Sequence, residues 1–245
     1  MGSRIIRLAT APSTNDLGKR LLRAGEPHGT VIVAAEQTHG RGRRGRRWAS
    51  PRGGLWASLL ARPTELTLEQ SGLLNVAVAV GAAQAVSAVS GVPVALKWPN
   101  DLLAAGRKVG GVLVEISIKG EHMQWAVIGV GINANVSRAD LPQALRPASA
   151  SLREEAGRII PLNALLQAIC ARVEGLLILI EAGHADEVLD AWGALDSTVG
   201  RKVRASRGEG WRGAAIGIDA RGRLVVRVAD GRTVKLATTS GFVIE

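Results

Sequence analysis

Arginine and glycine are concentrated in residues 37–48, directly after an apolar run at residues 31–35 that predicts a buried strand. The stretch contains five arginines and three glycines and ends at Trp48. Glycine lets the backbone approach a ligand closely, and the guanidinium group offers forked N–H donors that match phosphate and carboxylate. The pattern predicts a loop for an anionic ligand at a strand end. A solvated basic loop or a nucleic-acid patch is equally compatible with this stretch alone.

The same loop contains a match to the dinucleotide-binding fingerprint G-x-G-x-x-G, at Gly40, Gly42 and Gly45. That fingerprint requires a helix that opens at the glycines and packs on the sheet. Residues 46–54 have no apolar helical period. We therefore do not expect a Rossmann site here.

Two further segments combine polar groups with glycine. Residues 97–101 follow an apolar run with the sequence Lys-Trp-Pro-Asn-Asp, and residues 107–111 follow with Arg-Lys-Val-Gly-Gly. Pro-Asn-Asp is also ordinary turn chemistry. In residues 128–135 glycines interrupt a strand before Asn133. Glycine inside a strand often marks the close approach of a ligand or of another backbone segment.

A small polar cluster, Ser13, Thr14 and Asn15, opens a predicted helix. Ser and Thr are preferred at helix N-caps, and Asp16 suits the first turn, so capping explains the cluster without a function. The alternative is that these side chains hydrogen-bond a polar ring of a ligand.

The composition limits the class of protein. With 245 residues, 47% of them apolar, the chain suits one large domain, or one domain with a small appendage. We expect no membrane span, because no stretch reaches about 18 uncharged apolar residues, and we see no signal peptide. The single cysteine, Cys170, excludes an intrachain disulfide and fits a cytoplasmic protein. The net charge of +10 favours an acidic partner or nucleic acid.

Periodicity and turn residues divide the chain into two parts. In the larger part we expect strands at residues 4–8, 31–35, 54–61, 92–97, 109–118 and 124–130, and helices at 13–25, 67–90, 161–182 and 185–195. After Ser197 short strands are expected at 199–203, 211–218, 224–228 and 233–236. Asp230-Gly231 is a strong hairpin signal. The last fifty or so residues therefore predict a small all-β barrel.

Taken together, the three glycine-containing segments resemble the biotin–protein ligases, and the resemblance runs from residue 13 through the C-terminal barrel. It implies an α/β (α+β) fold. Residues 1–196 would form a biotin- and ATP-binding catalytic domain with a mixed sheet, like that of class II aminoacyl-tRNA synthetases, and residues 197–245 an SH3-like barrel. It also implies the reaction, in which ATP converts biotin to biotinyl-5′-AMP and biotin then moves to one lysine of a biotin carboxyl carrier protein.

The resemblance also implies the site residues. For the biotin ring these are Ser13, Thr14, Asn15 and Gln37, with Gly111 and Gly129 admitting the ligand to the backbone. The residues that close over biotin and phosphate are Gly40, Arg41, Gly42 and Arg43. The adenylate side comprises Arg43, Arg46, Trp48, Lys97, Asn100, Lys108, Ile132 and Asn133. Lys108, which meets the biotin carboxylate and the α-phosphate, and Arg43 are the implied catalytic residues. Mg²⁺ would bind to the phosphates, and Asp101 is a candidate for the metal, for the incoming lysine or for a plain turn role.

Three further expectations concern alternatives and partners. A lipoate or octanoate ligase shares the wider fold, but the arginine loop together with Lys-Trp-Pro-Asn-Asp favours biotin. A nucleic-acid-binding module would explain the charge and the barrel but not the glycines of the motifs. Some family members carry an N-terminal helix-turn-helix repressor domain. Since the first strand begins by Arg4, we expect no DNA binding by that route. We also expect no membrane association, and the resemblance implies a monomer or homodimer.

Overall fold

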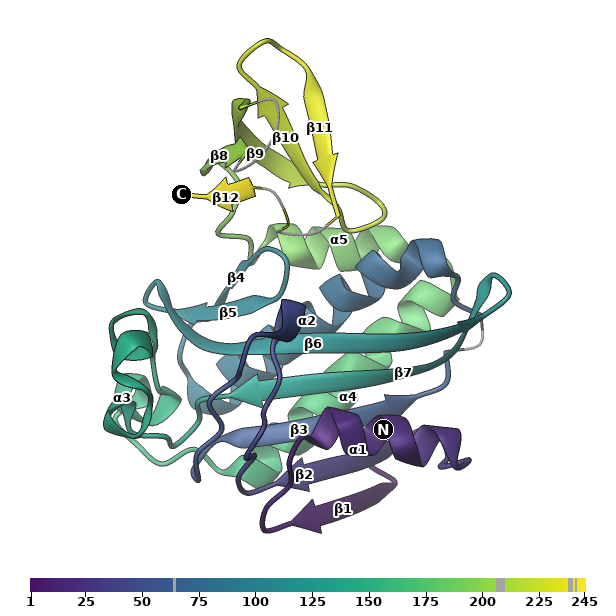
Figure 1. Ribbon diagram of the computed structural model, residues 1–245, viewed down its shortest axis with the longest axis vertical. Coiled ribbons are helices and arrows are strands. Elements are labelled where there is room, and N and C mark those ends of the chain that lie inside the picture. Colours follow the sequence, from purple (N-terminus) through teal and green to yellow (C-terminus); the bar gives the residue numbers. More distant parts are fainter. Residues whose placement is uncertain (64, 206–209, 238–239, 241) are drawn as a thin grey trace.

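The computed structural model describes residues 1–63, 65–205, 210–237, 240 and 242–245. A seven-stranded mixed sheet forms the body of the molecule, and a smaller five-stranded sheet lies above it (Figure 1). The order of the larger sheet is β1-β2-β3-β7-β6-β5-β4. Only β1 and β2 among these described strands pair in parallel. Its strands are β1 (Arg4–Leu8), β2 (Thr30–Ala34), β3 (Leu55–Ala61), β4 (Ala95–Lys97), β5 (Asp101–Ala104), β6 (Arg107–Lys119) and β7 (His122–Ile132).

Helices cover the two faces of this sheet unequally. The long helices α2 (Ser71–Ser90) and α4 (Leu162–Glu181) lie behind it, and the short α1 (Thr14–Arg23) lies in front (Figure 1). The remaining helices are α3 (Leu152–Ala156), α5 (Ala185–Gly193) and the 3₁₀ turns Arg43–Gly45, Leu68–Gln70, Arg138–Asp140 and Gln143–Ala148. The main core lies between the sheet and α2 and α4, and a smaller apolar cluster lies beneath α1.

Strand alternation assigns the glycines of β6 and β7 to the front face. Gly129 pairs with Ser58 on one side and Leu113 on the other, and Gly131 pairs with Gly111. Successive residues of a strand point to opposite faces. Ile128, Val130 and Ile132, which alternate with these glycines along β7, therefore face the helices and join the main core. The front face therefore lacks side chains at three neighbouring positions beside α1.

Two segments, Leu68–Ser90 and Leu162–Glu181, are long and apolar enough to cross a membrane by length and composition alone. Two-thirds of the apolar window of the first, and 44% of that of the second, is buried inside the fold. The two helices also approach each other closely, because a Cβ atom at Gly81 would lie 3.1 Å from the backbone nitrogen of Val173. Both act as core helices behind the sheet, which is consistent with a soluble protein.

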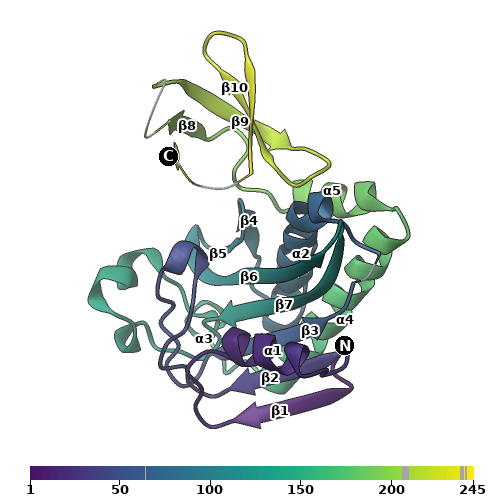
Figure 2. The same ribbon diagram turned by 45° about the vertical axis from the view of Figure 1, so that its right-hand side comes forward.

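The C-terminal sheet is entirely antiparallel, in the order β11-β10-β9-β8-β12. Its strands are β8 (Lys202–Ala205), β9 (Arg212–Ile218), β10 (Leu224–Val228), β11 (Thr233–Leu236) and β12 (Phe242–Ile244). It curls over α5 and the end of β4, as the turned view in Figure 2 shows. The predicted barrel is confirmed, with a fifth strand, β12, that the sequence did not indicate.

Trp98 attaches this small sheet to the body. Its indole N–H donates to the carbonyl oxygen of Gly222 at 2.9 Å, and its ring stacks on Phe242 with 6.1 Å between centroids. Its backbone N–H donates to the hydroxyl of Thr198 at 2.8 Å. A Cβ atom at Gly72, at the start of α2, would collide with the carbonyl oxygen of Arg221. The close docking places β12 over one end of the larger sheet.

We expect Trp98→Phe to destabilise the protein by about 1–3 kcal/mol, because it leaves the buried Gly222 carbonyl without its donor. Trp192→Phe is the matched control, since Trp192 is equally buried and its indole nitrogen has no partner among the described residues. Urea unfolding of both variants measures the difference. Equal losses of free energy of unfolding would show that the Trp98–Gly222 bond contributes nothing.

Most predicted elements are confirmed, and the differences have local causes. Helix α2 begins at Ser71 rather than Thr67, because Thr67 caps a separate 3₁₀ turn. Pro161 is the N-cap of α4, not its first helical residue. The short elements β5 and α3 were not predicted, since four or five residues carry too little periodicity to be recognised.

Candidate functional site

A cavity of about 400 Å³ lies on the front face of the larger sheet. The glycine-containing parts of β6 and β7 form its floor, the start of α1 one wall, and the arginine-rich stretch at residues 41–48 its cover. Phe242 and Ile244 of β12 border it from the C-terminal sheet. Segments far apart in the sequence therefore meet around one cavity.

The glycines of the floor admit side chains from the walls. A Cβ atom at Gly129 would overlap the side-chain amide of Asn15, and one at Gly131 would lie 2.8 Å from Nε1 of Trp48. A Cβ atom at Gly111 would be 3.5 Å from Cε of Lys108. Asn15 and Trp48 can therefore lie directly on the sheet, and the backbone of the strands borders the cavity.

One end of the cavity is lined by a buried hydrogen-bonded cluster of uncharged polar groups. The backbone N–H of Thr14 donates to Oε1 of Gln37 at 2.8 Å. The hydroxyl of Ser58 bonds to Oγ1 of Thr14 at 2.8 Å and to Oδ1 of Asn15 at 2.6 Å. Ser13 caps α1 by accepting from the N–H of Asp16 at 3.3 Å. The capping interpretation is confirmed, and the same residues also line the cavity.

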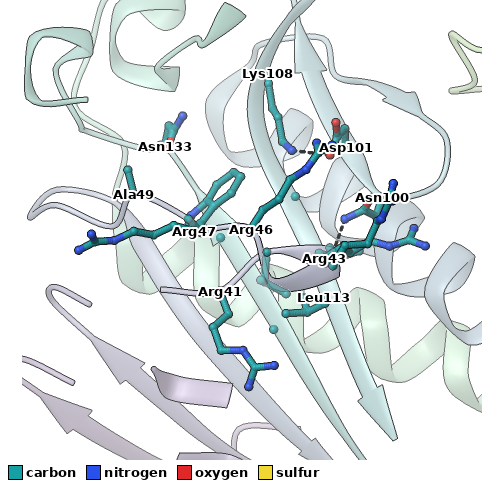
Figure 3. Close-up of a pocket in the computed structure, with 18 of the residues that line it drawn as sticks. Arg41, Arg43, Arg46, Arg47, Ala49, Asn100, Asp101, Lys108, Leu113 and Asn133 are labelled. Carbon is teal, nitrogen blue, oxygen red and sulfur yellow. Dashed lines mark hydrogen bonds and ion pairs between the residues drawn. The ribbon is translucent and has the colours of Figure 1, made fainter. Parts of the chain in front are cut away.

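The other end is strongly cationic. Apart from Arg41, six of the lining residues are Arg or Lys and a single lining residue, Asp101, is acidic. Lys108 Nζ lies 2.5 Å from Oδ1 of Asp101 and 5.0 Å from the centre of the Trp48 ring. Figure 3 shows Lys108 and Asp101 facing each other beside Arg46. This end has an unbalanced positive charge that a polyanionic ligand would neutralise.

The environment of Arg43 lowers the pKa of its side chain. Burial lowers the pKa of its guanidinium below the usual value; the negative charge of Asp101 opposes the shift, and the positive charge of Arg44 adds to it. An arginine stays charged in proteins, so a desolvated guanidinium favours the arrival of an anion. The position of Arg43 in the cavity cover suits contact with a phosphate group.

The cover is a narrow hairpin. Trp48 N–H donates to the carbonyl of Gly40 at 2.9 Å, and Gly42 N–H to that of Arg46 at 2.7 Å. The turn between them, Arg43–Gly45, is a three-residue 3₁₀ segment in which Arg44 has φ 59°. No long helix opens at these glycines, which confirms that the dinucleotide fingerprint is coincidental.

We expect hydrogen exchange in residues 39–47 to slow when an anionic ligand occupies the cavity. Five arginines in seven residues repel one another, and three glycines add chain freedom. A bound anion supplies the missing counter-charge. Hydrogen–deuterium exchange with and without the ligands that the resemblance implies, biotin or its adenylate, measures the change, and equal exchange in both states would contradict the expectation.

A family model described as "Biotin/lipoate A/B protein ligase family" matches residues 8–133, more than half of the chain. The matched region contains α1, the arginine loop and the glycines of the floor. The chain belongs to this family. The resemblance found from the motifs is thereby confirmed.

Individual ligases of the family agree with this assignment. The chain is 32% identical to the bifunctional ligase/repressor BirA of Bacillus spizizenii, covering 94% of this chain and 71% of that protein. It is also 32% identical to the biotin–[acetyl-CoA-carboxylase] ligase of Paracoccus denitrificans, covering 93% and 95%. The structure superimposes on the Aquifex aeolicus biotin protein ligase in complex with biotin and ATP with a TM-score of 0.83, at 28% identity and 99% coverage of both chains. The predicted fold, a mixed α/β body with an SH3-like C-terminal sheet, is that of these ligases.

Most residues that the ligase resemblance implied lie together around the cavity. The lining includes Ser13, Thr14, Asn15, Gln37, Arg41, Gly42, Arg43, Arg46, Trp48, Lys97, Asn100, Asp101, Lys108, Gly111, Gly129 and Asn133. Gly40 and Ile132 do not line it. Gly40 is enclosed by Trp48 and Ser50 at the base of the hairpin, and the side chain of Ile132 points into the main core.

Sequence reasoning missed part of the ligase cavity. Leu113 lies two residues after Gly111 on the same face of β6, so strand alternation could have identified it. Phe242 and Ile244 carry no local signal, since they reach the cavity only through docking of the C-terminal sheet.

Proposed function

We propose that this protein is a biotin–protein ligase that makes biotinyl-5′-AMP and transfers biotin to a lysine of a carrier protein. The observation that carries the proposal is a single cavity with an uncharged polar end and a strongly cationic end. A ligand with a polar ring at one end and a carboxylate at the other fits this arrangement. ATP supplies further negative charge for the cationic end.

The polar end favours biotin over lipoate. The ureido ring of biotin has both hydrogen-bond donors and an acceptor, whereas the dithiolane ring of lipoate offers no strong ones. Ser13, Thr14 and Asn15 are each at most 5% exposed and present hydroxyl and amide groups there. These groups already bond to one another, so a ligand ring must use their remaining donors and acceptors, and a ring that cannot do so binds less well. Gln37 completes the set of proposed ring contacts.

The first step joins two anions. A carboxylate oxygen of biotin attacks the α-phosphorus of ATP, the bond from that phosphorus to the bridging oxygen breaks, and pyrophosphate leaves. Lys108 and Arg43 offset the repulsion between carboxylate and phosphate and stabilise the charge of the transition state. Arg46, Lys97, Asn100, Asn133 and the Trp48 ring form the proposed adenylate side.

Mg²⁺ fits this site as an ion held mainly by the nucleotide. The described residues contain no group of three or more His, Cys, Asp or Glu side chains that could hold a metal. Magnesium in nucleotide sites commonly binds one or two carboxylates besides phosphate oxygens. Asp101 is the acidic residue available in the cavity. When bound, the ion neutralises phosphate charge.

In the second step the amine of the carrier lysine attacks the acyl carbon of biotinyl-5′-AMP. An amide bond forms, the acyl–phosphate bond breaks, AMP leaves and the amine loses a proton. No nucleophile of the ligase is required. We assign catalysis to residues 1–196 and a supporting role to residues 197–245, with a biotin carboxyl carrier domain as partner, in the cytoplasm, as a monomer or homodimer.

The test is to incubate the protein with biotin, ATP–Mg²⁺ and a biotin carboxyl carrier domain. We expect biotin on the acceptor lysine and none on a control carrier in which that lysine is replaced by arginine. Parallel reactions and thermal-shift titrations with lipoate distinguish a biotin ligase from a lipoate ligase. A thermal shift with lipoate alone, or no labelling by well-folded protein, would refute the proposal.

A further inference from the structure

Arg41 is in the cover of the cavity, yet its guanidinium points away from Lys108 and Asn100 (Figure 3). Its NH1 group pairs with Oδ1 of Asp16 on α1. Its NH2 group lies 3.3 Å from Oε1 of Glu115 on β6. The donors of this arginine are therefore engaged by two carboxylates of the protein rather than directed at a ligand carboxylate or phosphate.

Glu115 has a second set of contacts. Its Oε2 accepts a hydrogen bond from Nδ2 of Asn15 at 2.9 Å, and its Oε1 lies 3.0 Å from Nζ of Lys19. Asn15 in turn accepts from the hydroxyl of Ser58, at the polar end of the cavity. A continuous chain of polar contacts thus runs from Ser58 through Asn15 and Glu115 to Arg41.

The charges in this chain balance. Two acidic side chains, Asp16 and Glu115, meet two basic ones, Lys19 and Arg41, and Lys19 also lies 2.7 Å from Asp16. Burial acts to raise the pKa of Asp16, but hydrogen bonds from Lys19 and Arg41 outweigh it and lower that pKa below its usual value. Isolated surface pairs are weak, whereas a network with Glu115 and Lys19 about one-fifth exposed is screened less.

We propose that Glu115, together with Asp16, holds the arginine loop on α1 through Arg41, and that the same Glu115 carboxylate orients Asn15. Glu115 is then a positioning residue that links the polar end of the cavity to its cover. Arg41 acts as the tether of the loop and not as a biotin ligand. The part of this inference that concerns biotin and its adenylate rests on the proposed function; the tether itself does not.

Two substitutions at Glu115 separate the two contacts. Glu115→Gln keeps an oxygen that can accept from Asn15 but removes the charge that holds Arg41. Glu115→Ala removes both. For Glu115→Gln we expect loop exchange and biotinyl-5′-AMP dissociation to rise roughly tenfold, the usual effect of losing a charge-assisted contact, with biotin affinity within about threefold of wild type. For Glu115→Ala we expect biotin affinity to fall roughly tenfold as well.

The decisive measurement is a double-mutant cycle on hydrogen exchange of residues 39–47 in the ligand-free protein. Arg41→Met and Glu115→Gln should each speed exchange, and the double variant should exchange no faster than Arg41→Met alone, because Arg41→Met already removes the contacts with both Asp16 and Glu115. Arg47→Met is the matched control on the same hairpin. Arg47 donates to the carbonyl of Thr38 at 2.9 Å, so its effect should add to that of Glu115→Gln.

Additive effects of Arg41→Met and Glu115→Gln, or unchanged exchange in both, would overturn the proposal. Circular dichroism and melting temperature show whether each variant is folded. If Glu115→Ala does not fold, Glu115→Gln alone provides the test. The exchange cycle requires neither biotin nor ATP. Failure of biotinylation with an intact cycle would refute the proposed function alone, and failure of the cycle with normal biotinylation would refute the tether alone.

Discussion

Replacing Lys108 with alanine should slow biotinyl-5′-AMP formation by about tenfold to a hundredfold and change biotin affinity much less. The ammonium lies in the cationic end of the cavity, 5.0 Å from the Trp48 ring centre and paired with Asp101. The attacking carboxylate and the α-phosphate repel each other most strongly as they approach. A charge-assisted contact at that point is typically worth about 1.5–3 kcal/mol, which corresponds to the expected loss of rate.

Pre-steady-state release of pyrophosphate measures this step, and a biotin titration in the absence of ATP measures affinity. Lys119→Ala is the control, because Lys119 is at the far, exposed end of the same strand β6 and does not line the cavity. It should leave both quantities unchanged. Pyrophosphate release at the wild-type rate from Lys108→Ala would show that this ammonium does not act in the first step.

Replacing Arg43 with glycine should release the intermediate before the carrier lysine arrives. Biotinyl-5′-AMP is a mixed anhydride that reacts with any amine and with water, so specificity depends on retaining it behind the closed cover. Arg43 is partly desolvated at the turn of that cover, where its guanidinium can hold the phosphate. Loss of a contact worth about 1.5–3 kcal/mol should speed dissociation roughly tenfold to a hundredfold.

The measurement is biotin labelling of an unrelated lysine-rich protein mixed with the carrier domain. Arg43→Gly should label the bystander, and Arg43→Ala should do so nearly as well, because the lost guanidinium matters more than the added backbone freedom. Arg52→Ala removes an exposed arginine that does not line the cavity and should label only the carrier. Carrier-only labelling by an Arg43→Gly variant that still makes adenylate would exclude Arg43 as the retaining contact.

The sequence by itself determined the features that depend on neighbouring residues. Apolar runs located β1, β2 and β3, and the Ser13 cluster located the start of α1, because strand alternation and helix capping are set within a few residues. The arginine and glycine motifs indicated both the anionic-ligand loop and the family. The glycines within residues 128–135 indicated a close approach of a ligand or of another backbone segment, and Gly129 and Gly131 line the cavity.

The tertiary structure decided where those side chains point and which distant residues meet them. Arg41 has the same local signal as Arg43, but only the packing of α1 on β3 and β7, beside β6, places Asp16 and Glu115 within its reach. The motif around Ile132 implied a contact with the adenylate. The register of β7 with β3 and β6 instead turns the Ile132 side chain into the core.

Docking of the C-terminal sheet was the second feature that only the tertiary structure decided. Trp98 belongs to a motif that suggested ligand chemistry, and its indole instead holds the Gly222 carbonyl and stacks on Phe242. That docking brings Phe242 and Ile244 to the cavity from more than a hundred residues away. Contacts of this kind depend on how whole elements pack and not on the propensity of any single segment, which is why no local pattern could reveal them.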